Sequence, residues 1–158
     1  MSVLDTDLKP HRVPSGFKFF GIARGTLAGE FNDDDRQVVA RYRLGSDFDM
    51  ARTLSICYSP AGRSLNCVEG AKPTDLSVGG LDAQYFDGQW APGPGPGQQD
   101  TVVGPVHWDT TIQHSLQVFV PDVGTVAVRV SPAYAPSQTD LGRIAASLPR
   151  FTSWSGRE

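Results

Sequence analysis

The chain has 158 residues, which suits one domain around one hydrophobic core. Hydrophobic residues make up 39% and charged residues 20%, the composition of a globular protein and not of a disordered one. The net charge is −3 and no Lys/Arg cluster stands out, which argues against nucleic acid as a partner. The sequence has neither a membrane-length apolar run nor a cationic amphipathic helix, so we expect no direct membrane insertion.

The N-terminal residues 1–11 are polar and show no apolar signal-peptide region. Two interpretations follow. The chain is cytoplasmic and complete, or it is a soluble fragment of a longer secreted or anchored protein. The residues themselves leave both open.

We expect three segments along the chain. Residues 1–14 are predicted as an extended lead-in, because Pro10 and Pro14 oppose a helix. Residues 15–149 are predicted to form a single α+β domain. Residues 150–158 are predicted to be a C-terminal tail that covers a sheet edge or stays disordered.

Roughly eight or nine strands are predicted from runs of β-forming residues bounded by turn residues. The clearer runs are 17–20, 37–44, 52–58, 74–78, 83–90, 106–109, 115–120 and 125–130, with weaker patterns at 26–31 and 65–68. Turns are predicted at 32–35, 45–47 and 122–124. The alternating Pro/Gly stretch 91–97 is predicted to be an exposed, mobile loop.

A helix is predicted near the C-terminus. Ser137 to Asp140 has the pattern of a helix start, and Pro149 stops the helix. An apolar stripe at helical spacing is formed by Leu141, Ile144, Ala145 and Leu148. Such a stripe needs a sheet to lie on. The predicted fold is therefore α+β, a curved antiparallel sheet or half-barrel with a C-terminal helix packed on it.

Few residues suggest chemistry. His107, Asp109 and His114 have the residue types of a metal site or an acid/base pair, but no further ligand has diagnostic spacing. Solvated residues at a strand end are the favoured interpretation, so we expect no catalytic residue, no metal and no cofactor. Residues 62–66 do not complete a nucleophile elbow. Cys57 and Cys67 are expected to have structural roles, as thiols or as a pair.

Aromatic residues gather on either side of the Pro/Gly stretch. Tyr85, Phe86, Trp90 and Trp108 are the predicted ligand-binding residues, because aromatic side chains beside a mobile loop can line a cleft. The alternative is that they fill the core of the sheet.

The order of several short motifs resembles bacterial domains of unknown function in the extracytoplasmic parts of anti-sigma-type regulators and lipoproteins. These motifs are Gly80-Leu81-Asp82-Ala83 before a strand, Trp108 in a later strand, and the closing helix at 140–148. The periplasmic lipoprotein carrier, a half-open barrel with a helical cover, has a similar architecture. The resemblance implies an extracytoplasmic or secreted fragment rather than a cytoplasmic protein, and it implies no catalytic residues.

Three functions are considered. The first is a non-enzymatic extracytoplasmic sensing or binding module that takes a small apolar ligand or a protein segment on its concave face. The second is a small hydrolase or metal-dependent enzyme that uses His107, Asp109 and His114. The third is a structural interaction domain. An empty apolar concave face favours the first function, and a filled one favours the third.

Overall fold

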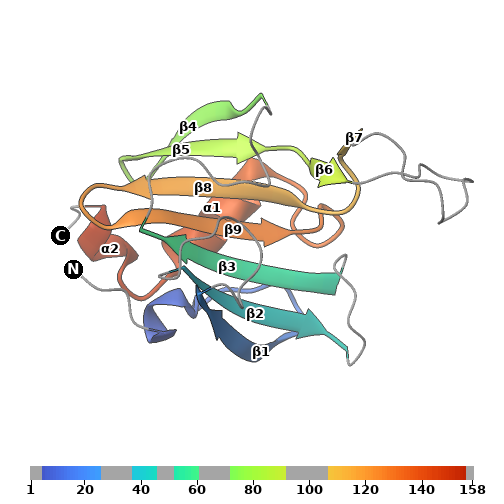
Figure 1. Ribbon diagram of the computed structural model, residues 1–158, viewed down its shortest axis with the longest axis horizontal. Coiled ribbons are helices and arrows are strands. Elements are labelled where there is room, and N and C mark those ends of the chain that lie inside the picture. Colours follow the sequence, from blue (N-terminus) through green and yellow to red (C-terminus); the bar gives the residue numbers. More distant parts are fainter. Residues whose placement is uncertain (1–4, 26–36, 46–51, 61–71, 92–106, 156–158) are drawn as a thin grey trace, which may run out of the picture.

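The computed structural model describes residues 5–25, 37–45, 52–60, 72–91 and 107–155 (Figure 1). Several predicted features lie outside these ranges: the strands at 26–31 and 65–68, the turn at 32–35, the loop at 92–97, and Cys67. The described residues form one large antiparallel sheet, a small second sheet, and three short helical segments.

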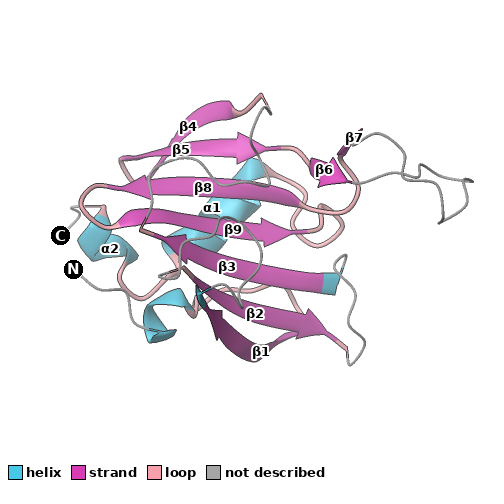
Figure 2. Cartoon of the chain, viewed as in Figure 1, coloured by secondary structure: helices cyan, strands magenta, loops and turns pink. Residues whose placement is uncertain are grey.

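The large sheet has seven strands in the order β1-β2-β3-β9-β8-β5-β4, and every neighbouring pair is antiparallel. Its strands are β1 Phe17–Arg24, β2 Val38–Leu44, β3 Thr53–Ser59, β4 Thr74–Val78, β5 Leu81–Phe86, β8 His114–Val120 and β9 Gly124–Val130. The sheet is open, and one helix packs on it near the C-terminus (Figure 2). The predicted α+β class is confirmed.

Two strand predictions were wrong, one in the extent of the strand and one in its pairing. The single strand predicted over 83–90 is divided at Asp87–Gly88 into β5 and β6, Gln89–Ala91. The run 106–109 does not continue the large sheet, because β7, His107–Asp109, pairs with β6 in a separate two-stranded sheet. Gly88 permits this pairing, because the Asp109 backbone lies so close to Gly88 that a side chain there has no room.

The C-terminal helix α1 spans Gln138–Ala146 and starts where the sequence predicts. Ser137 and Asp140 form a reciprocal capping box: the Ser137 hydroxyl accepts from the Asp140 amide at 3.1 Å, and the Asp140 carboxylate accepts from the Ser137 amide at 3.2 Å. The predicted apolar stripe is buried, with Leu141 at 0% and Leu148 at 4% exposure. The helix lies across β8 and β9 (Figure 1).

The first and last residues that the structure describes are packed against the core. Residues Asp5–Leu8 form a 3-10 turn, η1, and Leu8 is fully buried. Helix α2, Phe151–Trp154, lies in the predicted tail with both aromatic rings buried in the main core. Arg150 Nη1 lies 3.3 Å from Asp7 Oδ2, and this ion pair joins the two ends. Residues 1–14 were predicted to be an extended lead-in, and the 3-10 turn at Asp5–Leu8 departs from that prediction. The turn buries the Leu8 side chain, and this burial outweighs the preference for an extended backbone.

Leu148→Ala should lower the free energy of unfolding by about 2–5 kcal/mol, because it removes a buried side chain and leaves a cavity. Arg143→Ala is the matched control, since Arg143 is exposed on α1, which ends two residues before Leu148, and should change stability by no more than about 0.5 kcal/mol. Urea unfolding measures both variants. Equal, small effects would show that the helix does not seal the core.

Candidate functional site

Asp109 has a local structural role. Its carboxylate Oδ1 accepts hydrogen bonds from the Thr111 hydroxyl at 2.6 Å and the Thr111 amide at 2.8 Å. The Thr111 hydroxyl and then its amide lower the pKa of Asp109, and His107 adds a smaller favourable charge. The carboxylate thus shapes the turn that leads from β7 into β8.

His114 is buried in the large sheet, with 1% of its surface exposed. Its Nδ1 lies 2.8 Å from the Tyr85 hydroxyl, and the two rings meet edge to face at 5.5 Å. Burial lowers the pKa of His114, and the Ala135 backbone and Asp140 oppose that shift. The His114 Nε2 atom is buried without a hydrogen bond to any residue that the structure describes.

The predicted chemical trio is therefore not one site. His107 and Asp109 belong to the small sheet, whereas His114 lies on the α1 side of the large sheet beside Tyr85. Within the described ranges, no group of three His, Cys, Asp or Glu side chains is placed to hold a metal ion.

Tyr85 and Phe86 lie on opposite faces of the large sheet, and Trp90 and Trp108 lie on the strands of the small sheet. Tyr85 packs against the main core on the α1 side. Phe86 belongs to a second cluster on the opposite face, and Trp108 packs against that cluster. The Trp108 indole donates to Asp87 Oδ1 at 2.7 Å, and Trp90 is the strand partner of Trp108. Phe86 and Trp108 are thus brought into one cluster, whereas Tyr85 lies in the other.

The α1 side of the sheet is filled. Leu116 and Val118 of β8 and Val128 of β9 are 0–1% exposed, and they belong to the same core cluster as Leu141 and Ile144 of α1. On the opposite face, Cys57 is a buried thiol. The packed side chains on the α1 side leave no room for a small apolar ligand, which favours a binding surface elsewhere on the molecule.

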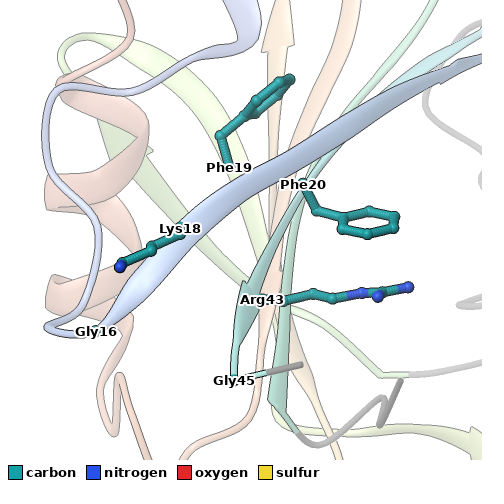
Figure 3. A pocket seen from close by; sticks show the side chains of 6 residues that line it. All are labelled: Gly16, Lys18, Phe19, Phe20, Arg43 and Gly45. Carbon is teal, nitrogen blue, oxygen red and sulfur yellow. The ribbon is translucent and has the colours of Figure 1, made fainter. Parts of the chain in front are cut away.

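A surface pocket that the sequence did not predict lies at the edge strand β1 (Figure 3). It has a volume of ≈ 400 Å³ and is lined by Gly16, Lys18, Phe19, Phe20, Arg43 and Gly45. Phe19 is 42% exposed and Phe20 57% exposed, although both are large apolar side chains. Exposed aromatic pairs of this kind are typical of interaction sites.

The two rings lie on opposite sides of β1, next to a β-bulge. The pairing of β1 with β2 shifts between Phe19 and Gly21, which leaves Phe20 as the inserted residue. The Phe19 ring meets Tyr42 edge to face at 5.5 Å on the α1 side. The Phe20 ring lies over the Arg43 guanidinium at 3.4 Å, and Figure 3 shows the two rings leaving the strand in different directions.

Positive charge surrounds this edge. Lys9 Nζ lies 4.1 Å from the Phe19 ring centroid, and Lys18 lines the pocket. Residues 8–25 and 37–45 together contain six Lys/Arg and no Asp/Glu, although the whole chain has a net charge of −3. The basic edge is assembled by strand pairing, so no contiguous cluster shows it in the sequence. The sequence signal that could have indicated this surface is the pair of consecutive phenylalanines. Adjacent side chains of a regular strand point to opposite faces, so the two rings cannot both face the same core.

Comparison of the chain with protein-family models, with curated proteins and with solved structures finds no match. The resemblance to extracytoplasmic regulator domains therefore stays a prediction. Among the helices that the structure describes, none combines the length and apolar character needed to cross a membrane.

The buried histidine makes stability depend on pH. Because the folded-state pKa of His114 is lowered, the unfolded chain takes up a proton at its ordinary value of about 6.5 while the folded protein does not. The stability is thus complete above that pH and is lost as the pH falls below it. His114→Gln should reduce this loss between about pH 7 and pH 5, as measured by urea unfolding across that range.

The matched control is His11→Gln, because His11 is exposed and the substitution is the same. This variant should keep the wild-type pH dependence. Identical slopes in wild type and His114→Gln would show that His114 is protonated equally in both states.

Proposed function

We propose that this protein is a non-enzymatic interaction module that binds an extended segment of a partner protein along the edge strand β1. The observation that carries the proposal is the exposed pair Phe19 and Phe20, which flanks both sides of that strand. The filled α1 side of the sheet supports an interaction domain over a carrier of a small apolar ligand.

The arrangement of the rings favours a strand as the occupant. A segment added beside β1 would extend the sheet in its own plane and cover both phenylalanines. A flat membrane surface or a stacked nucleobase approaches from one side and would leave one ring exposed. Main-chain hydrogen bonds supply affinity in such additions, and side-chain pockets supply selectivity.

The charges define the chemistry of the partner. Lys9, Lys18 and Arg43 lie beside the two rings, so the matching segment carries Asp or Glu next to an apolar or aromatic residue. The bulge and Lys18 also hinder indiscriminate pairing with other sheet edges. Binding thus depends on complementary side chains as well as on the backbone. As the sequence resemblance implies, the proposal includes an extracytoplasmic setting.

A peptide-display selection tests the proposal. Random peptides selected on the wild-type protein should be enriched in acidic residues next to aromatic or β-branched residues. Phe20→Ser should weaken binding of the selected peptides by at least about tenfold, because it removes apolar contact area from a residue at the centre of the surface. Fluorescence anisotropy gives the dissociation constants.

The charge requirement has its own matched pair of variants. Lys18→Glu should abolish binding of the acidic peptides and select basic ones, whereas Lys72→Glu should change neither. Lys72 is exposed, and it lies two residues before β4 at the other edge of the sheet. Equal effects of the two variants, or selected peptides without acidic residues, would contradict the proposal.

A further inference from the structure

The large sheet ends in two edges of opposite chemical character. Strands β1 and β4 are its outermost strands, and neither has a partner on its outer side among the strands that the structure describes (Figure 1). The β1 edge carries the basic, aromatic surface described above. On β4, Thr74, Asp75 and Ser77 are exposed. Each edge therefore offers backbone groups to a further strand.

The β4 edge has the composition that the β1 edge requires of its partner. Asp75 stands next to Leu76 in an extended strand, which sets an acidic residue beside an apolar one. The Gln84 amide donates to Asp75 Oδ1 at 3.1 Å and holds the carboxylate at the strand. Residues 72–91 contain three Asp and one Lys, in contrast to the basic ranges that form the β1 edge. The two edges are thus complementary in charge, and every copy of the chain presents both.

The faces of the two edge strands match as well. Leu76 packs against the main core on the α1 side, and strand alternation turns Asp75 to the opposite face. On β1, Phe19 lies on the α1 side, whereas Lys18 and its strand partner Arg43 lie on the opposite face. A β4 strand laid beside β1 in the same orientation therefore brings the leucine to the phenylalanine and the carboxylate to the cations.

The strand directions permit this arrangement. Every neighbouring pair in the seven-stranded sheet is antiparallel, so β1 and β4 run in the same direction. A second copy in the same orientation sets its β4 parallel to β1 and keeps its α1 on the same side of the joined sheet. Parallel and antiparallel pairs occur together in many large sheets.

We propose that the segment bound at the β1 edge is strand β4 of a second copy of this chain, an inference that rests on the proposed function. The two sheets join into one, Leu76 covers the Phe19 ring, and Asp75 pairs with Lys18 in the positive field of Arg43. Two copies joined in this way leave one β1 edge and one β4 edge open, so the contact repeats. The protein assembles head to tail into open chains whose length rises with its concentration.

Sedimentation velocity over a concentration series up to the millimolar range measures this assembly. The wild-type protein should form species larger than a dimer, because the contact does not close on itself. Asp75→Lys should weaken the association by at least about tenfold, because it sets like charges against each other. The matched control is Asp82→Lys, which makes the same charge change at an exposed residue of the inner strand β5 and should retain the association. Equal effects of the two variants would overturn the proposal.

Charge reversal provides a second test of the same contact. Lys18→Glu should weaken the association as Asp75→Lys does, and the variant with both substitutions should regain it, because each contact then holds the reversed pair. An equimolar mixture of the two single variants should also associate, since β4 of one and β1 of the other are unchanged. If both the double variant and the mixture stay dissociated, β1 and β4 do not meet.

Peptides selected on the β1 edge separate this inference from the proposed function. They occupy β1 and should therefore dissociate the assemblies. A wild-type protein that binds these peptides and yet stays monomeric up to millimolar concentration would overturn the self-association and leave the proposed function intact. Failure to bind any selected peptide, at concentrations where the protein is monomeric, would contradict the proposed function itself.

Discussion

The β8–β9 hairpin is the element on which the rest of the fold depends, because α1 lies on it and β3 and β5 pair with its two outer sides. Apart from His114, its α1-facing side chains are valine and leucine, and those in the middle of the hairpin are 0–2% exposed. The Tyr58 hydroxyl donates to the Val123 carbonyl at 2.8 Å and holds the turn. Gly124 has a φ of +140° and lies against the Ser59 carbonyl, so a larger residue would separate β9 from β3 there.

The two faces of the sheet bury different kinds of side chain. The α1 face buries aliphatic side chains, and its stability comes from area removed from water. The opposite face buries serine, glutamine and arginine among a small apolar cluster of Val39, Cys57, Phe86 and Ala127. Burial of polar groups stabilises a fold only where their hydrogen bonds are complete. The Ser115 hydroxyl and the Gln117 amide are buried without such hydrogen bonds to any residue that the structure describes, so their burial costs stability.

The β1 edge shows a related conflict between folding and function. An exposed phenylalanine pair at a sheet edge increases the risk of aggregation, and a fold under selection for stability alone would place charged residues there. Lys9 and Arg43 cover the rings in part, as cations over aromatic faces. They limit the exposed apolar area while leaving the surface available to a segment of opposite charge.

The sequence determined the features that depend on local patterns. The capping box at Ser137, the stripe from Leu141 to Leu148 and the hairpin across 122–124 follow from the spacing of neighbouring residues, and these features are present where the sequence predicts them. From them follows the α+β class, because an amphipathic helix after two strands needs a sheet to cover.

Only the tertiary structure decided which strands pair and which side chains meet. Nothing local in His107–Asp109 shows that it leaves the large sheet to pair with β6, because the pairing depends on residues far away in the chain, including Gly88, against which the Asp109 backbone lies. The basic edge brings together residues of η1, β1 and β2, and the polar face brings together residues of β3, β8 and β9. Such sites depend on contacts between residues far apart in the chain, and a short sequence pattern carries no information about them.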